Sequence, residues 1–477
     1  MSALKEFAIQ VVRRLTEAGH RAVFAGGCVR DMVLGKEPKD YDVATAATPA
    51  QVMALFRRNI PVGVAFGVVR VLPDRADRNV RSTPSDVCST QNADGNVCST
   101  PLEVSTQMQV EVATFRGETT YSDGRHPDNV CFTNEVEDVK RRDFTINGLL
   151  FDPLKNELLD YVDGRRDLER KVIRAIGDPK RRFGEDHLRM LRAIRFATRL
   201  GFEIEGATLG AIKDNAEKIT SISSERIRDE LNQMLSGPNP RAAFELLKKS
   251  RLLKFILPEI DVMEGVEQPP EYHPEGDVWK HTLMLLGQLE NAPLTLALGA
   301  LFHDVGKPPT FQRVDRIRFN EHERVGAVMT EEIMTRLKYS NVEIERVVSL
   351  VRQHMVFKDT QKMRKATLKR FLRQPHFEEH LSLHRIDCMA SHGSLSNLEF
   401  CLEELGKQPA QQLRPVPLIT GEDLIKLGLK PGPRFKDLLT QVEDAQLEGT
   451  LNSREEAMEF VKTLAGVSLS PPGRGPT

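Results

Sequence analysis

The sequence predicts an α+β protein in which a small mixed α/β head is followed by an all-helical remainder. Short β-type runs alternate with helical patterns over residues 1–150, whereas helical periodicity dominates from about residue 167 to residue 464. The 477 residues are too many for one ordinary domain. An apolar content of 40% and a charged content of 28% are typical of a globular protein with an ample core.

Composition also excludes several classes of protein. No apolar run approaches the roughly 20 residues that span a bilayer, and residues 1–20 form an amphipathic helical pattern rather than a signal peptide. The six cysteines contain no C-x-x-C pair, which argues against a zinc finger and favours reduced thiols in a cytoplasmic protein. With a net charge of −1, any affinity for RNA has to come from local clusters of arginine and lysine.

In the head, four strands are expected at residues 22–25, 41–44, 68–72 and 110–115. Thr48 followed by Pro49 is typical of an N-cap and a first helical residue, so we expect a helix that continues to Phe56. The polar segment 74–107 contains a near-repeat and interrupts the hairpin between the last two strands. We therefore predict a flexible insertion at the tip of that hairpin.

Proline pairs and composition predict where the domains end. Pro269-Pro270 marks a boundary in the helical part, and the Pro- and Gly-rich end of the chain is expected to be disordered. The expected divisions are a head (1–150), a helical neck and body (151–268), a further helical domain (269–395), a helical C-terminal region (396–465) and a tail (466–477).

Two carboxylates close together in the sequence indicate a metal site. If residues 40–43 form a strand, Asp40 and Asp42 project from the same face and repel each other. Hard divalent cations such as Mg²⁺ would relieve that repulsion. Glu111, which points away from the face of Val110 and Val112, is a candidate third acid on a neighbouring strand. A lone D-x-D pair is more often a surface turn.

The double glycine Gly26-Gly27 lies between an expected strand and an expected helix. Glycines at such a place let backbone N–H groups approach a triphosphate, and the helix that follows offers its positive end. A simple tight turn explains two glycines equally well.

Four motifs follow one another in a recognisable order: Gly-Gly-Cys-Val-Arg-Asp at 26–31, Asp-Tyr-Asp at 40–42, Arg-Arg-Asp-Phe-Thr-Ile-Asn at 141–147 and Glu-Asp-His-Leu-Arg at 185–189. Over roughly residues 20–260 the chain resembles the bacterial class II tRNA nucleotidyltransferase and poly(A) polymerase family, within the polymerase-β-like superfamily. The resemblance implies that Asp40 and Asp42 bind magnesium and that Glu111 is the third acid. It further implies nucleotide-binding roles for Gly26, Gly27, Arg30, Asp31, Arg141, Arg142, Asp143, Asn147 and Arg192.

Residues 185–200 are expected to form one helix. Met190, Leu191, Ile194 and Ala197 share an apolar face, while Arg192, Arg195 and Arg199 share the opposite face. These arginines face either phosphate or solvent.

Asp186 and Arg189 lie three residues apart on the flank of this expected helix. Cytosine and adenine both present an amino donor beside a ring-nitrogen acceptor, whereas uracil and guanine present the reverse order. A carboxylate beside a guanidinium therefore fits C and A and disfavours U and G. The resemblance assigns this base-reading role to Asp186 and Arg189; an ordinary helical ion pair is the alternative.

Four histidines and two aspartates follow further along the chain: His281, His303, Asp304, His322, His354 and Asp387. Taken one by one, these histidines would be ordinary structural residues, but together with carboxylates they suit Mn, Fe, Ni or Zn. The order resembles the HD phosphohydrolase superfamily, whose members hydrolyse phosphomonoesters or cyclic phosphodiesters. The resemblance implies a core ligand set of His281, His303, Asp304 and Asp387, with His322 and His354 for a second metal.

The leading functional prediction is template-independent addition of C and A nucleotides to the 3′ end of tRNA, from CTP and ATP. A poly(A) polymerase or an enzyme that adds only CC or only A uses the same chemistry. The near-uncharged C-terminus favours tRNA among these, because many bacterial poly(A) polymerases carry a basic tail. Two other classes stay open: a metal phosphohydrolase of the HD type with an inactive head, and a non-catalytic RNA-binding protein. The sequence does not predict the oligomeric state.

Overall fold

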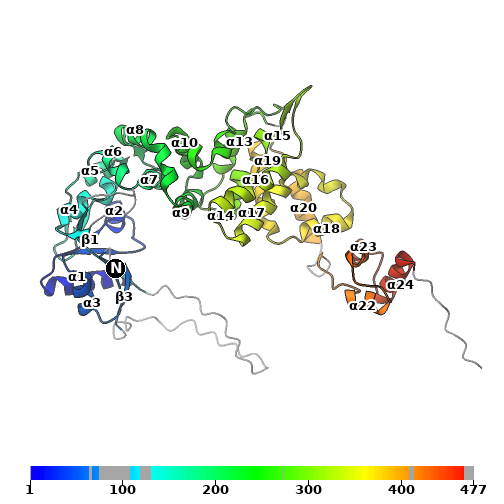
Figure 1. Cartoon of the computed structure of the whole chain (residues 1–477), viewed down its shortest axis with the longest axis horizontal. Coiled ribbons are helices and arrows are strands. Elements are labelled where there is room, and N and C mark those ends of the chain that lie inside the picture. Colours follow the sequence, from blue (N-terminus) through cyan, green and yellow to red (C-terminus); the bar gives the residue numbers. More distant parts are fainter. Residues whose placement is uncertain are drawn as a thin grey trace, which may run out of the picture. The chain divides into compact units, whose positions relative to one another are not determined.

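The computed structural model describes residues 2–63, 67–74, 108–118, 130–271, 273–407 and 413–466. The predicted insertion at 74–107 and the predicted tail at 466–477 lie outside these residues, apart from Asp74 and Gly466. The chain divides into two compact units, Met1–Pro258 and Glu259–Thr477, each of which is described here by itself (Figure 1). The finer division into five parts stays a prediction.

The first unit is built on a mixed sheet of seven strands, in the order β3-β4-β5-β2-β1-β8-β9. The neighbours β2 and β5 are parallel and the other pairs are antiparallel. The strand bounds are β1 Ala22–Ala25, β2 Asp42–Thr45, β3 Asn59–Gly63, β4 Val68–Val71, β5 Val110–Thr114, β8 Leu150–Asp152 and β9 Glu157–Leu159. The four predicted strands are therefore confirmed to within a residue or so.

The helices of the head follow the expected signals. Helix α1 (Ala3–Glu17) buries its apolar stripe and lies beside α3 (Pro49–Leu55) (Figure 1). Thr48 caps α3 in a reciprocal capping box with Gln51, as the Thr-Pro signal predicts. Between α1 and α3 in the sequence comes the short helix α2 (Gly27–Val33). The head is completed by the β6–β7 hairpin (Arg116–Glu118, Val130–Phe132), α4 (Glu135–Lys140) and the 3₁₀ turn η3 (Thr145–Asn147).

The condition under which Asp40 and Asp42 would project from the same face of one strand is not met. The strand begins at Asp42, and Asp40 lies in a bend before it. This bend buries Tyr41, whose ring lies 5.2 Å from the ring of Phe24. The bend thus places an aromatic side chain in the core directly before the strand begins.

The rest of the first unit is helical. Its elements are α5 (Gly164–Arg170), α6 (Pro179–Glu185), α7 (Arg189–Leu200), α8 (Gly206–Asn215), η4 (Ala216–Ser221), α9 (Ser224–Leu235), α10 (Pro240–Lys249), α11 (Leu253–Ile256) and α12 (Pro258–Asp261, which runs into the second unit). A two-residue parallel pair, β10 (Val172–Ile173) and β11 (Glu203–Ile204), ties α5 to the end of α7.

The prediction of one helix over residues 185–200 is wrong, because α6 ends at Glu185 and α7 begins at Arg189. Asp186 adopts an extended conformation, and its carboxylate accepts a hydrogen bond from the backbone N–H of Leu188 at 3.0 Å. A local side-chain acceptor of this kind competes with helix continuation. The predicted apolar face of α7 is confirmed, since Met190, Leu191, Ile194 and Ala197 are all buried.

The second unit is helical apart from one small hairpin, and its fold class agrees with the prediction. Its bounds are α13 Val278–Leu286, α14 Leu294–Phe302, α15 Lys307–Thr310, α16 His322–Arg336, α17 Asn341–Gln353, η5 His354–Lys362, α18 Lys365–Leu372, α19 Phe377–Ala390, α20 Ser396–Lys407, α22 Gly421–Lys426, α23 Pro433–Glu448 and α24 Arg454–Ala465. The exposed hairpin β12–β13 (Phe311–Arg313, Ile317–Phe319) was not predicted, because its strands are only three residues long.

Among the described residues, no helix is long and apolar enough to cross a membrane. The four described cysteines, Cys28, Cys131, Cys388 and Cys401, are free thiols as predicted; Cys88 and Cys98 lie outside the described residues. The cytoplasmic location stays a prediction.

Candidate active site and candidate metal centre

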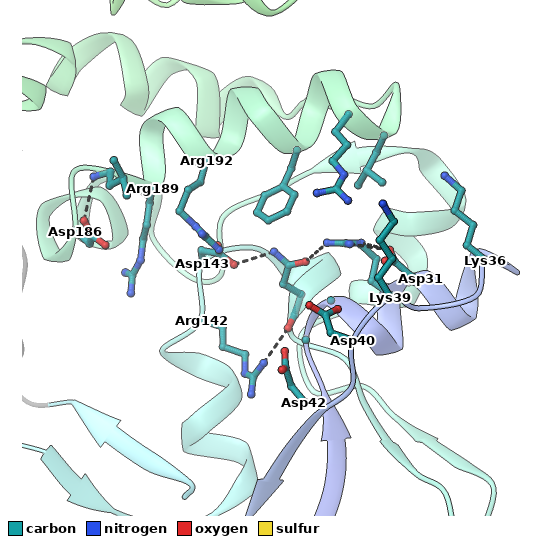
Figure 2. Close-up of a pocket in the computed structure, with 18 of the residues that line it drawn as sticks. Asp31, Lys36, Lys39, Asp40, Asp42, Arg142, Asp143, Asp186, Arg189 and Arg192 are labelled. Atoms are coloured by element: carbon teal, nitrogen blue, oxygen red, sulfur yellow. Dashed lines mark hydrogen bonds and ion pairs between the residues drawn. The ribbon is translucent and has the colours of Figure 1, made fainter. Parts of the chain in front are cut away.

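A pocket of about 710 Å³ in the first unit is lined by every predicted head residue except Glu111 (Figure 2). Asp40 and Asp42 lie on one side of this pocket, and Asp186 and Arg189 lie on the other. The structure thus brings residues from the turns after β1 and before β2, from the end of α4 and from α7 around one space. Seven further lining residues were not predicted from the sequence: Lys36, Glu37, Lys39, Leu188, Phe196, Leu200 and Arg226.

The three acids are related through the parallel strands β2 and β5, where Asp42 stands opposite Glu111. Loss of water in the crowded pocket wall, together with the charges of Asp40 and Glu111, raises the pKa of Asp42 to about 6. Glu111 also pairs with Arg70 at 2.8 Å. Within the described residues, ligand atoms of these three acids do not gather within 4.8 Å of one another. Mutually repelling carboxylate oxygens are nevertheless the donor set that suits a hard divalent cation.

The backbone at the double glycine is held in a conformation that requires glycine. Gly26 has φ 73° and ψ −130°, and a Cβ there would lie 3.1 Å from Nη1 of Arg142. Gly27 begins α2, so the backbone of both residues forms part of the pocket wall.

A chain of hydrogen bonds crosses the pocket from α2 to α7 (Figure 2). Arg30 donates to Asp31 at 2.7 and 2.8 Å and to Oδ1 of Asn147 at 2.9 Å. Asn147 donates to Oδ1 of Asp143 at 3.0 Å, and Arg192 donates to Oδ2 of Asp143 at 2.8 and 2.9 Å. Five predicted residues therefore form one network that joins the head to the neck.

Asp143 is the centre of this network. Burial would raise its pKa, but the charge of Arg192 and hydrogen bonds from Asn147, Arg192 and its own neighbour Phe144 lower it to about 2. The ring of Phe196, one turn along α7 from Arg192, has three guanidinium groups around it. The centroid distances are 5.4 Å from Arg30, 5.3 Å from Arg192 and 4.4 Å from Arg195.

The two adjacent arginines of the third motif share one buried anchor. Asp138, on α4, accepts from Arg141 at 2.6 Å and from Arg142 at 2.9 Å. Asp138 is almost fully buried, so both guanidinium groups are held at the pocket wall by a partner that the sequence analysis did not single out.

Asp186 and Arg189 line the same pocket, but neither is paired with the other. Asp186 forms an ion pair with Arg226 of α9 at 3.1 Å. Arg189 forms an ion pair with Glu185 at 2.7 Å and donates to the carbonyl oxygens of Arg182 and Arg141. Both side chains are thus oriented by third residues.

The predicted basic face of α7 is only partly correct. Arg192 and Arg199 line the pocket, whereas Arg195 is buried and forms an ion pair with Glu230 at 2.6 Å. Arg195 therefore faces neither phosphate nor solvent. Its partner was visible in the sequence, but the contact between α7 and α9 was not.

In the second unit, the six predicted histidine and aspartate residues come together from five elements. One group of ligand atoms comprises His281, His303 and Asp387, and an adjoining group comprises Asp304, His322 and His354. His281 Nε2 lies 3.0 Å from Asp387, and the Nε2 atoms of His322 and His354 are 3.2 Å apart. All six residues except Asp387 are nearly inaccessible to solvent.

Close backbone packing makes this cluster possible. A Cβ at Gly306 would lie 2.2 Å from the carbonyl oxygen of His322 and 2.6 Å from the N atom of Gly326. Only glycine therefore allows α16 to approach the His303-Asp304 turn, which places His322 Nε2 3.6 Å from Asp304.

The electrostatics of the cluster fit a bound cation. The neighbouring histidines and Lys307 hold the pKa of Asp304 well below its usual range despite its burial. Burial and the neighbouring imidazoles lower the pKa of His354 to about 3, which keeps it neutral. His303 Nε2 and Asp304 Oδ2 are buried 3.1 Å apart without hydrogen-bond geometry. Neutral imidazoles beside carboxylates are ligands for first-row transition metals.

Four residues beside this cluster were given no role from the sequence: Gln268, His273, Glu275 and Lys307. Lys307 reaches Asp304 at 2.7 Å and Gln268 at 2.5 Å. Glu275 lies 2.8 Å from His281 and 2.9 Å from His273, and these three residues form a third candidate group of ligand atoms.

Sequence models of three protein families match the chain. The "Poly A polymerase head domain" matches residues 22–101 and 73–174, the "Probable RNA and SrmB-binding site of polymerase A" matches 201–263, and the "HD domain" matches 276–389. Together with the two sites, these matches define a nucleotidyltransferase that carries an HD domain.

Comparison with individual proteins narrows the class. A CCA-adding enzyme of Lactobacillus johnsonii is 31% identical over 466 residues, which cover 95% of this chain and 96% of that protein. A CCA-adding enzyme of Bacillus pumilus is 36% identical over 285 residues, covering 59% and 63%. The chain belongs to the family of CCA-adding enzymes, so neither a poly(A) polymerase nor an HD hydrolase with an inactive head is favoured.

Solved structures show the same fold. The Bacillus stearothermophilus CCA-adding enzyme in complex with CTP has a TM-score of 0.70 at 24% identity and covers 98% of each chain. The Thermotoga maritima CCA-adding enzyme complexed with tRNA_CCA has a TM-score of 0.56 at 17% identity, covering 97% of this chain and 95% of that one.

Proposed function

We propose that this protein adds C and A nucleotides to the 3′ end of tRNA, with CTP and ATP as substrates. One observation supports this most strongly: a single pocket joins the acids Asp40 and Asp42 to the side chains of Asp186 and Arg189 (Figure 2). The relatives named above are CCA-adding enzymes, and solved structures of similar fold contain CTP or tRNA.

In this proposal Asp40 and Asp42 hold magnesium, and Glu111 supports them from the neighbouring strand. The ion, when bound, would lower the pKa of the attacking hydroxyl and neutralise charge on the triphosphate. The backbone of Gly26 and Gly27, with Arg30, Asp31, Arg141 and Arg142, binds the triphosphate and sugar. Lys36 and Lys39 line the same side of the pocket and add positive charge there. The 3′-hydroxyl of the RNA attacks the α-phosphorus, and pyrophosphate leaves.

Asp186 and Arg189 take the place of a template. The carboxylate accepts a hydrogen bond from the amino group of C or A, and the guanidinium donates one to the ring nitrogen. U and G would place an acceptor against the carboxylate and a donor against the guanidinium, so a desolvated site rejects them. Asn147 and Asp143 link Arg192, on the same helix as Arg189, to Arg30 and Asp31 of α2.

The experiment uses tRNA transcripts that end before the first C, before the second C or before the A of the CCA end. Each is incubated with single and mixed triphosphates, and the products are sequenced. CCA completion from all three supports the proposal, whereas long A tails or products that stop after CC contradict it. Asp42→Ala should abolish incorporation, and Asp214→Asn, at an exposed ion pair that does not line the pocket, is the matched control.

A second activity is favoured by the gathering of six ligands in the second unit. We propose that His281, His303, Asp304 and Asp387 hold a divalent metal such as Mn, Ni, Fe or Zn, with His322 and His354 available for a second ion. The chemistry supplied by the metal would be the hydrolysis of phosphomonoesters or cyclic phosphodiesters. Incubation with a nucleoside 2′,3′-cyclic phosphate and each metal tests this, and the absence of any hydrolysis would contradict it.

A further inference from the structure

Glu275 lies next to the metal centre proposed above, in the segment that leads into α13. Its side chain is 6% exposed, and Oε1 lies 2.8 Å from Nδ1 of His281. On the other side of the same ring, Nε2 of His281 lies 3.0 Å from Asp387. The imidazole is completely buried between the two carboxylates.

This arrangement gives the two ring nitrogens of His281 different roles. A neutral imidazole carries one proton, so a hydrogen bond from Nδ1–H to a carboxylate leaves Nε2 with its lone pair free. A carboxylate behind a ligating histidine also fixes the ring plane and makes the other nitrogen a better ligand. Nε2 faces the side of the ring where Asp387 and His303 supply the other ligand atoms of the group.

The surroundings hold Glu275 in this position. Nδ1 of His273 lies 2.9 Å from Oε1, and Nε2 of Gln268 lies 3.5 Å from it. The rings of His273 and His281 meet edge to face with centroids 4.8 Å apart. Oε2 of Glu275 is buried and makes no hydrogen bond within the described residues, and the 2.8 Å contact of Oε1 with Nδ1 of His281 is an ion-pair contact without hydrogen-bond geometry.

We propose that Glu275 is a positioning residue of the metal centre, which keeps His281 in the tautomer that binds metal through Nε2. The inference rests on the proposed metal centre of the HD domain. An alternative reading of the same three residues is a separate cation site made of His273, Glu275 and His281. That reading would require His281 to bind ions through both nitrogens at once, which neutral imidazole cannot do.

The test measures Mn²⁺ binding to metal-free full-length protein by calorimetry, in an Asp42→Asn background that removes binding to the head. Glu275→Leu and Glu275→Gln are nearly equal in size, but only the amide offers an acceptor to Nδ1–H. We expect Glu275→Leu to weaken Mn²⁺ binding by about 10- to 100-fold at an unchanged number of sites. Glu275→Gln should recover part of the loss. The exposed Glu271→Gln is the control.

Nitrogen NMR of the Zn²⁺-loaded protein gives an independent measure, because it reports which nitrogen of His281 carries the proton. A single Nδ1–H form should appear in the parent and in Glu275→Gln, and exchange should broaden it in Glu275→Leu. If either variant does not fold in the presence of chelator, Glu275→Asp takes its place. The proposal would be overturned if Glu275→Leu and the parent bound Mn²⁺ with equal affinity. It would also be overturned if Glu275→Leu lost one bound Mn²⁺ per chain while the remaining ions bound with unchanged affinity. A parent protein that binds no Mn²⁺ would instead contradict the metal centre itself.

Discussion

The carboxylate of Asp186 lies 3.1 Å from the guanidinium of Arg226, across the gap between the α6–α7 connection and α9. Asp186 is the residue that we propose to read the amino group of C or A. Arg226 lines the same pocket, and its Nη1 atom is buried without a hydrogen-bond partner within the described residues. The direction of this carboxylate is therefore set by a helix that follows it by 40 residues.

Replacement of Arg226 by methionine should reduce nucleotide selectivity. Without its partner the carboxylate of Asp186 is free to turn, so kcat/KM for CTP and ATP should fall by about 10- to 100-fold relative to UTP. Steady-state incorporation with each of the four triphosphates measures this. Arg228→Met, on the same helix beside Asp229, is the matched control; equal losses in both variants would contradict a specific role for Arg226.

Conversion of Asp186 to asparagine should admit the wrong bases. An amide offers a donor as well as an acceptor, so it can match the carbonyl of U or G, which a carboxylate repels. Incorporation of UTP relative to CTP should rise by about tenfold or more, as seen in sequenced products. An unchanged preference in this variant would mean that the bases are read elsewhere.

The repulsion between Asp40 and Asp42 should lower the free energy of unfolding when no cation is present. Because the pKa of Asp42 is raised to about 6, the folded protein holds a proton there that the unfolded chain has lost above about pH 4. In chelator, the free energy of unfolding should therefore fall as pH rises from about 4 through 6. Asp42→Asn should abolish this fall and raise the melting temperature at pH 7, as measured by thermal unfolding. A parent protein whose stability does not change over this range would contradict the charge repulsion.

The ion pair between Arg195 and Glu230 should be important for stability rather than for catalysis. Both side chains are buried, so Glu230→Ala leaves an uncompensated charge and should cost about 3–5 kcal/mol in the free energy of unfolding. Denaturant titration measures this loss. The exposed pair of Arg241 and Glu245 offers a comparison, since Glu245→Ala should cost less than about 1 kcal/mol.

The two chemical centres should be separable by mutation. Asp387→Asn should remove metal-dependent hydrolysis of a cyclic phosphodiester and leave CCA addition unchanged, because the acids of the nucleotidyl-transfer site lie in the other unit. Asp42→Ala should do the reverse. Both activities are measured on the same preparations; the loss of both activities in either variant would indicate a shared dependence.

Local patterns predicted much of this fold. Helix α14, for example, spans the long apolar run Leu294–Phe302 before the His-Asp pair. The cap at Thr48 and the strands β1, β4 and β5 also follow from short-range signals. Helical periodicity over residues 185–200, by contrast, hid the break at Asp186, since the carboxylate that ends the helix contributes equally well to a helical pattern.

Most predicted site residues do line one pocket or one cluster, yet their partners could not be read from the sequence. Arg226, Asp138 and Glu275 are common residue types at ordinary positions, and only the packing of distant elements shows which side chain each one holds. The contact between Tyr41 and Phe24 beside the bend at Asp40 is likewise not visible in the sequence.

The hydrogen-bonded chain from Asp31 through Asn147 to Arg192 couples the residues that we propose to bind the triphosphate to the helix that we propose to recognise the base. A misfit at the base edge would therefore be transmitted as a displacement of the phosphates. In such an arrangement fidelity does not require a separate proofreading step, because a wrongly chosen nucleotide is also a poorly aligned one.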